Sequence, residues 1–266
     1  MAVNRILTNK SDNSTNRIKE YWNRRGGVNS LDLIKLFEGY KFQYLEFGNY
    51  VNQRQRDEKL RAFLNGCEKE MSKLMKTKNL GIDRHISVSF GGRGTGTRGY
   101  SKTPAIAHFE PATCFINFTK NHGLESFAHE YFHALDYLVG RYIEPMSRCN
   151  YLSQSYDVTE PLPPIRAAMQ NLMLDYYLIQ KEKNPNFLKV DNLKYWASPV
   201  ECFARLSEQC TAVWLVNHNI TNTIAKNMKF YQEHSNVYMP FDVMIEIYPL
   251  WEKLIEKFRA VIKGKI

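Results

Sequence analysis

The chain has 266 residues, of which 44% are hydrophobic and 24% are charged, and its formal net charge is +9 at pH 7. This ordinary globular composition excludes wholesale disorder and collagen-like repeats, and the length suffices for one large hydrophobic core or two small ones. No apolar run approaches the roughly 18 residues that span a bilayer, and the N-terminus lacks the apolar stretch of a signal peptide. We therefore expect one main globular domain with helical additions and no membrane anchor.

Cysteine usage and charge bear on where such a protein works. The five cysteines are scattered, with neither C-x-x-C spacing nor the density of a disulfide scaffold, which predicts a reducing, intracellular setting. The excess of basic residues favours a nucleic-acid partner. Between Arg54 and Arg61, however, basic residues alternate with acidic ones, and a solvated face of mixed charge is the simpler interpretation. Charge alone therefore does not decide the function.

The first 80 residues are predicted to be helical. Apolar residues at helical spacing occur between Ile18 and Trp22, and Ser30 can cap a helix that carries apolar residues up to Phe37. A longer amphipathic helix is expected from about Val51 to Met75, because apolar residues recur there at spacings of three and four.

The pattern then changes to the alternation that is typical of β-strands. The predicted strands are His85 to Phe90, Ala105 to Phe109 and Thr113 to Phe118. They are bounded by Gly and Pro, and we expect them to form a small, mainly antiparallel sheet.

A glycine-rich segment between the first two predicted strands contains a formal G-x-G-x-x-G at Gly94, Gly96 and Gly99. A dinucleotide-binding fingerprint must open a helix whose N-terminus holds the pyrophosphate, whereas this segment leads into another predicted strand. We therefore reject a nucleotide cofactor, and the absence of G-K-[ST] excludes a P-loop. The segment is interpreted as a flexible hairpin, with a loop that lies against a substrate as the alternative.

The remainder of the chain returns to helical periodicity, and no long linker divides it. The predicted helices are Leu124 to Val139, Ile165 to Lys183, Pro199 to Val216, and about Phe241 to Lys263.

The first of these helices carries His-Glu-x-x-His at His129, Glu130 and His133. At ~100° per residue, positions i and i+4 lie about 40° apart around a helix and ~6 Å apart along it, so both histidines can bind one metal ion. Two neutral imidazoles suit Zn²⁺, and Glu130 lies beside them, placed to take a proton from water as a general base. A chance match is the alternative, but a buried helix tolerates paired histidines poorly unless something satisfies them.

A catalytic zinc site needs a third protein ligand, and Glu201 is the best candidate. The spacing of Glu201 also predicts a capping box with Ser198 and an i,i+4 ion pair with Arg205, and spacing alone favours that structural role. Asp136, three residues after His133, is interpreted as the acceptor of a hydrogen bond from a ligand imidazole, with a solvated aspartate as the alternative. The other candidate ligands are Glu208, His108 and His122.

Several separated segments resemble, in the same order, the first of the large polyvalent protein-associated domains, a zincin-like domain of phages, plasmids and other mobile elements. These segments are FGNYVNQ at 47–53, GGRG at 91–94, AHFEP at 107–111, INFTK at 116–120, AHEYFHALD at 128–136 and PVECFAR at 199–205. The resemblance covers roughly residues 40 to 210 and leaves both ends of the chain unexplained.

Together with the predicted elements, the resemblance implies an α+β, zincin-like fold. In it, the small, mainly antiparallel sheet packs on the His-Glu-x-x-His helix. The implied parts are an N-terminal helical extension at 1–40, a zincin-like metallopeptidase domain at 41–218, and a C-terminal helical extension at 219–266 packed on that domain. The resemblance further implies a Zn²⁺ ion held by His129, His133 and Glu201, with Glu130 as the catalytic base.

The main hypothesis is a zinc-dependent metallopeptidase of phage or mobile-element origin. It would hydrolyse a peptide or protein substrate in the host-cell cytoplasm, or be packaged in the virion. An edge strand would align an extended peptide, and Arg205, Tyr195 or Arg93 are candidates to stabilise the oxyanion.

The alternative hypothesis is a non-catalytic module of the same fold that binds nucleic acid or belongs to the virion, with the metal structural or absent. It predicts binding to DNA or RNA that depends steeply on salt.

Overall fold

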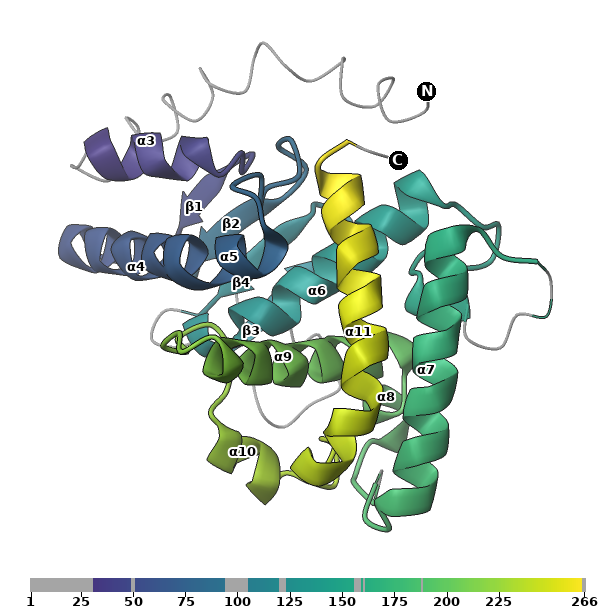
Figure 1. The fold of residues 1–266 in the computed structure, drawn as a ribbon. Coiled ribbons are helices and arrows are strands. Elements are labelled where there is room, and N and C mark those ends of the chain that lie inside the picture. The colour runs from purple at the N-terminus through teal and green to yellow at the C-terminus, as the bar shows by residue number, and fades with distance from the viewer. Residues whose placement is uncertain are drawn as a thin grey trace.

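The computed structural model describes residues 31–48, 51–93, 105–119, 123–155, 159, 161–187 and 189–264. Within these ranges the fold is α+β, with a small sheet that packs against helices and further helices beyond them (Figure 1). The predicted helix near residues 18–22, the glycine fingerprint and His122 lie outside the described residues. Buried apolar side chains from α3 to α11 form one continuous core.

The first described elements are α3 (Leu31–Gly39), β1 (Leu45–Phe47) and a long helix in three pieces. Its pieces are α4 (Gln53–Gly66), the π-helical turn η1 (Cys67–Met71) and α5 (Ser72–Met75). α4 begins at a capping box, in which Asn52 and Gln55 each bond the other's backbone N–H through their side chains. On its exposed face, Arg54 pairs with Glu58 at 2.8 Å, which fits the solvated face of mixed charge predicted from the sequence.

The sheet has the strand order β1-β2-β4-β3, with β2 (Ser87–Phe90), β3 (Ala107–Glu110) and β4 (Phe115–Phe118). β1 and β2 are parallel, β2 and β4 are parallel, and β3 pairs antiparallel with β4. The prediction of a mainly antiparallel sheet is therefore wrong. β3 and β4 do form a hairpin, but β4 inserts between β2 and β3 and so runs parallel to β2, while the helical crossover from β1 to β2 makes that pair parallel as well.

The two faces of the sheet differ in polarity, as the alternation in the sequence predicted. Phe47, Phe90 and Phe118 lie side by side in register on one face, with ring centroids 5.4 Å apart between neighbours. Phe63 of α4 packs 4.9 Å from Phe127 of α6, and both rings contact this row. These two helices therefore cover the same apolar face of the sheet.

The helix with the His-Glu-x-x-His sequence is α6 (Phe127–Leu138), which is preceded by the 3-10 turn η2 (Leu124–Ser126) and continues as the π-helical turn η3 (Val139–Ile143). After the short turn η4 (Ser153–Ser155), the remaining helices are α7 (Pro164–Lys183), α8 (Leu193–Trp196), α9 (Pro199–Asn217), α10 (Met228–Glu233) and α11 (Phe241–Ile262). The long helices agree with the prediction to within a few residues, whereas β1, α8 and α10 were not predicted because each is too short to show a period.

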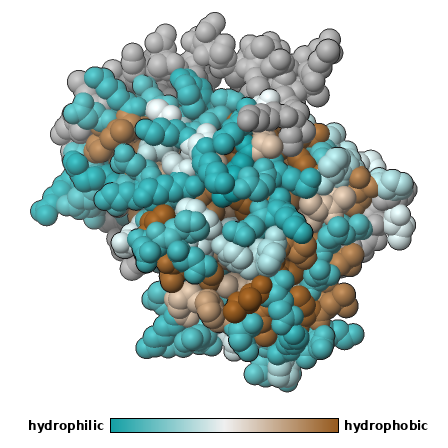
Figure 2. Space-filling view, in the orientation of Figure 1, coloured by the Kyte–Doolittle hydropathy of each residue, from teal (hydrophilic) through white to brown (hydrophobic). Residues whose placement is uncertain are grey.

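α6 packs along α9, and α11 crosses α9 and runs beside α7 (Figure 1). Figure 2 shows hydrophilic residues over α4 and α5, while hydrophobic residues gather over the lower parts of α7 and α11. The most exposed large apolar side chains there are Leu178 on α7 and Ile245 on α11. None of the helices in the described ranges is long and apolar enough to cross a membrane.

Candidate metal centre

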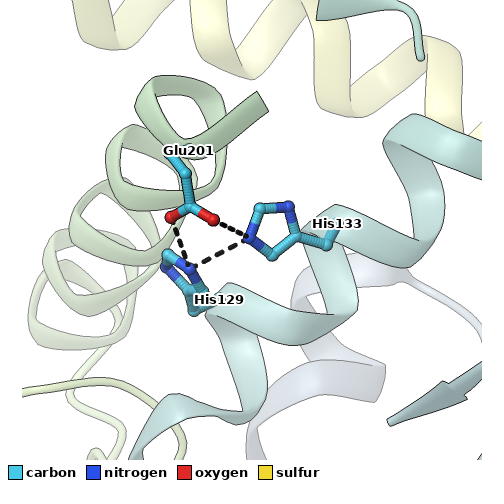
Figure 3. A group of neighbouring side chains, drawn as sticks. All are labelled: His129, His133 and Glu201. Carbon is cyan, nitrogen blue, oxygen red and sulfur yellow. Dashed lines mark hydrogen bonds and ion pairs between the residues drawn. The ribbon is translucent and has the colours of Figure 1, made fainter. Parts of the chain in front are cut away.

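Three side chains from two helices converge at one point (Figure 3). His129 and His133 project from successive turns of α6, and their Nε2 atoms lie 3.1 Å apart. Glu201 reaches them from the first turn of α9, with one carboxylate oxygen 3.5 Å from His129 Nε2 and the other 3.4 Å from His133 Nε2. The three residues form a group that can hold a metal ion.

The spacing of these donor atoms suits a tetrahedral ion. Zinc bonds of ~2.0–2.1 Å at a tetrahedral angle place ligand atoms ~3.3–3.4 Å apart. The two Nε2 atoms are 3.1 Å apart, and each lies 3.4 or 3.5 Å from a different oxygen of Glu201, so these contacts are close to that value. One ligand atom from each of the three residues lies within 4.8 Å of the other two. Two imidazoles and one carboxylate are also a common ligand set of catalytic zinc sites.

The charge around the group favours a cation. Burial would lower the pKa of His129, but hydrogen bonds to Glu201 and Glu208 and the charge of Glu130 raise it to about 10. Burial would raise the pKa of Glu201, yet His133 and His129 hold it well below its ordinary value. In the described part of the chain, the ion pairs of Glu201 and Glu208 are made with these histidines alone. Two buried carboxylates, Glu130 and Glu208, and the partly buried Glu201 carboxylate surround two imidazoles and leave an excess of negative charge that a divalent ion would neutralise.

Glu130 is buried on α6 between the two histidines in sequence. Burial raises its pKa, and the nearby His129 and His133 oppose that rise. No hydrogen bond or ion pair engages its carboxylate within the residues that the structure describes. The carboxylate is therefore available to exchange a proton.

The start of α9 shows why Glu201 is free to face the histidines. Ser198 caps the helix by accepting the Glu201 backbone N–H at 3.4 Å, which is one half of the predicted capping box. The other half is not formed, because the Ser198 backbone N–H donates to the carbonyl of Tyr195 instead of to the Glu201 side chain. The predicted ion pair with Arg205 is not formed. The Arg205 guanidinium instead donates to the backbone carbonyl of Glu201 at 3.2 Å and to that of Trp196, and it lies 5.0 Å from the Trp196 ring. The Glu201 carboxylate is thus left to the histidines.

Glu208 lies on the opposite side of His129 from Glu201. One of its oxygens is 3.5 Å from His129 Nδ1, whereas the donor atom shared with the group is Nε2. The sequence analysis named Glu208 as another candidate for the third ligand. In the structure Glu208 contacts His129 at Nδ1, the ring nitrogen that does not belong to the metal-binding group. The signal in the sequence is the polar run Ser207-Glu208-Gln209 within an otherwise largely apolar helix.

Asp136 is fully buried one turn beyond His133, but its hydrogen bonds do not go to a histidine. Its two carboxylate oxygens accept the backbone N–H of Ser153 at 2.9 Å and the hydroxyl of Ser153 at 2.6 Å. Burial raises the pKa of Asp136 to about 6, against these two hydrogen bonds. The described contacts of Asp136 therefore tie α6 to the loop at η4, which differs from the hydrogen bond to a ligand imidazole expected from the sequence.

Of the three candidates for oxyanion stabilisation, Tyr195 is the one beside the metal-binding group. Tyr195 on α8 exposes 45% of its surface, yet its pKa is raised by burial, by the charge of Glu201 and by a hydrogen bond to that carboxylate. Arg205 is anchored through Nε and Nη2 by backbone carbonyls, as described above.

Arg93 and His108 are held by other groups. Arg93 pairs with Glu46 at 2.9 Å and with Glu110 at 2.8 Å and lies over the Phe115 ring. His108 lies 3.4 Å from Glu110, and its sheet row is the polar one, opposite the face that α4 and α6 cover. Neither residue belongs to the group formed by His129, His133 and Glu201.

In comparisons with known proteins, no family model, no curated protein and no solved structure matches the chain. Membership of the family that the sequence motifs resemble therefore stays a prediction. The structure supports, on its own, a largely buried His-Glu-x-x-His helix whose two histidines meet a glutamate from a second helix, as in a zincin-like metal site. The class of site that these residues define is a possible metal-binding site with the ligand types of zincin-like proteins.

Proposed function

We propose that the protein is a zinc-dependent metallopeptidase, of the kind that the sequence resemblance assigns to phages and mobile elements. The observation that carries the proposal is the convergence of His129, His133 and Glu201, with one ligand atom of each within 4.8 Å of the others and the carboxylate of Glu130 close to both histidines. A structural zinc site would need a fourth protein ligand, and it would have no use for a free buried carboxylate. A site with three ligands and a base suits hydrolysis.

The side chains divide the work between binding and proton transfer. His129, His133 and Glu201 would hold the zinc, which when bound supplies a Lewis acid that polarises a peptide carbonyl and lowers the pKa of water. Glu130 takes a proton from the attacking water and passes it to the leaving amine. The raised pKa of Glu130 suits this exchange, because a base works best when its pKa is near the working pH.

Two neighbouring features support a peptide as the substrate. Among the described residues β3 is an edge strand of the sheet and packs beside α6, so its outer edge can pair with an extended peptide. The hydroxyl of Tyr195 lies at the Glu201 carboxylate and can donate to the oxygen that becomes negative as water attacks.

The proposal is tested with Glu130→Gln in the zinc-loaded protein, using a mixture of unstructured peptides as substrate and mass spectrometry to detect products. We expect cleavage to fall by ~10²-fold or more while zinc is retained, because the amide keeps the shape but cannot accept the proton. Cleavage at the wild-type rate would contradict the role of Glu130. Absence of cleavage by the wild type, together with tight, salt-sensitive binding to DNA or RNA, would favour the non-catalytic alternative.

A further inference from the structure

α9 carries three consecutive polar residues in the interior of the protein. Ser207, Glu208 and Gln209 are 0%, 2% and 1% exposed. Buried polar groups are costly unless they are hydrogen-bonded, so each needs a partner. All three find partners in the C-terminal segment 226–251.

Two of these residues make contacts that only join α9 to the C-terminal segment. The Ser207 hydroxyl accepts the indole N–H of Trp251 at 3.2 Å. The Gln209 side chain exchanges two hydrogen bonds with the backbone of Met239, donating at 2.6 Å and accepting at 3.2 Å. Neither residue touches the metal centre.

Glu208 differs because it also contacts a metal ligand. One oxygen accepts the backbone N–H of Lys226 at 3.2 Å, and the other accepts the hydroxyl of Tyr238 at 3.1 Å. The second oxygen lies 3.5 Å from His129 Nδ1. Glu208 therefore connects the C-terminal segment to the imidazole whose other nitrogen faces Glu201 and His133.

A carboxylate at this position has a defined chemical effect. A neutral imidazole carries its proton on one nitrogen, and an acceptor at Nδ1 keeps the proton there, so that the Nε2 lone pair is free for a metal. The acceptor also fixes the orientation of the ring and makes Nε2 more basic. Both effects need the carboxylate held still, which the hydrogen bonds from Lys226 and Tyr238 achieve.

We propose that Glu208 is a positioning residue of the metal centre, and that the segment 226–238 is part of that centre because it holds Glu208. This inference rests on the proposed function in requiring that His129 binds zinc. It assigns to the C-terminal part of the chain a role in metal affinity. A merely structural Glu208 would change the stability of the α9 interface without changing zinc affinity.

The test compares the zinc affinity of full-length variants by competition with a chromophoric chelator. We expect Glu208→Gln to bind zinc ~10–100-fold more weakly, the usual effect of removing a partner of a ligand histidine. Tyr238→Phe should weaken binding in the same direction but less, because the Lys226 N–H still holds the carboxylate. Ser207→Ala is the matched control, since it breaks the neighbouring bond to Trp251 at the same interface and leaves Glu208 intact.

A second readout separates positioning from general loosening of the fold. With Co²⁺ in place of zinc, the visible absorption reports ligand geometry, and we expect it to change in Glu208→Gln and Tyr238→Phe but not in Ser207→Ala. Wild-type affinity and spectrum in the two Glu208-linked variants, or equal losses in Ser207→Ala, would overturn the positioning role alone. No zinc binding by the wild type would overturn the proposed function as well. Tyr238→Phe removes a single hydroxyl, so it decides the question even if Glu208→Gln does not fold.

Discussion

Tyr195 lies on α8 and Arg205 on the next helix, α9, and their different surroundings give them different roles. Arg205 is buried and donates through Nε and Nη2 to the carbonyls of Glu201 and Trp196, which sets the corner between α8 and α9, while its Nη1 has no hydrogen-bond partner among the described residues. Tyr195 keeps an exposed ring, and its hydroxyl is at the Glu201 carboxylate. Tyr195 is the better candidate donor to a developing oxyanion because its ring is exposed and its hydroxyl lies at a residue of the metal-binding group, whereas two backbone carbonyls anchor the buried Arg205 guanidinium.

Tyr195→Phe tests that role at the scale of one oxygen atom. We expect kcat for peptide cleavage to fall by ~10²-fold, with KM and zinc content little changed, because the lost hydrogen bond is needed in the transition state. Steady-state kinetics on one peptide checks this, and Tyr142→Phe, at an exposed tyrosine on η3, is the control. An unchanged kcat would remove Tyr195 from the mechanism.

Asp136 gives a prediction about pH and stability. Its pKa is raised from 3.8 in the unfolded chain to about 6 in the fold, chiefly by burial. The folded state therefore binds this proton more tightly, so the stabilisation is complete below pH ~4 and is lost as the pH rises through about 6. A shift of about 2 units corresponds to on the order of 3 kcal/mol.

Urea unfolding of the metal-free protein at several pH values tests whether the stability changes with pH in this direction. From pH 4 to pH 7, the free energy of unfolding of the wild type should fall relative to that of Asp136→Asn, which cannot ionise. A difference that stays constant over this range would contradict the raised pKa.

At the scale of elements, α6 is held from several sides. Phe127, at its first turn, packs against Phe63 of α4 and Phe118 of the sheet. The backbone N–H of Ala128 donates to the carbonyl of Ile224 at 2.9 Å, so the loop after α9 satisfies a donor at the start of the helix. His129 follows directly, and its position depends on these contacts.

Phe63→Ala should expose this dependence. Phe63 is fully buried among aromatic rings of α4, the sheet and α6, and removing it should lower the free energy of unfolding by about 3–5 kcal/mol. Phe241→Ala, at a position that is 42% exposed, should cost far less. Equal losses in the two variants, measured by denaturant unfolding, would contradict the core assigned to Phe63.

The local sequence pattern predicted where helices and strands lie better than it predicted how they pack and pair with one another. The spacing of His129 and His133 predicts a shared face because helical geometry is local. Strand order is set by contacts between distant segments, so the insertion of β4 between β2 and β3 left no mark in the sequence. The role of Glu201 was equally hard to predict. Its spacing from Ser198 predicts that Ser198 caps the helix, but the approach of α6 to α9, which brings Glu201 to the histidines, is a contact between distant segments. The position of Glu208 behind His129 likewise depends on packing.

At the scale of the whole molecule, the metal centre joins α6 to α9, two helices far apart in the sequence that belong to one core. The net charge of +9 is not gathered at this centre, where buried carboxylates dominate. Binding a cation there would relieve their mutual repulsion and link the two helices. Zinc should therefore stabilise the fold as well as serve the reaction.

A thermal melt tests this linkage. At a free zinc concentration ~1,000 times Kd, the gain in the free energy of unfolding should be about 4 kcal/mol, visible as a higher Tm that a chelator reverses. Ser207→Ala should respond as the wild type does, whereas His133→Ala should show little gain. An equal rise of Tm in His133→Ala would place the stabilising zinc elsewhere.

The most direct test of the metal centre is the zinc content of purified protein, measured by inductively coupled plasma mass spectrometry for the wild type and His129→Ala side by side. The geometry predicts one zinc per chain in the wild type and a small fraction of that in the variant, because two ligands cannot replace the set of His129, His133 and Glu201. A wild type without stoichiometric zinc after metal loading, or a variant with undiminished zinc, would contradict the site.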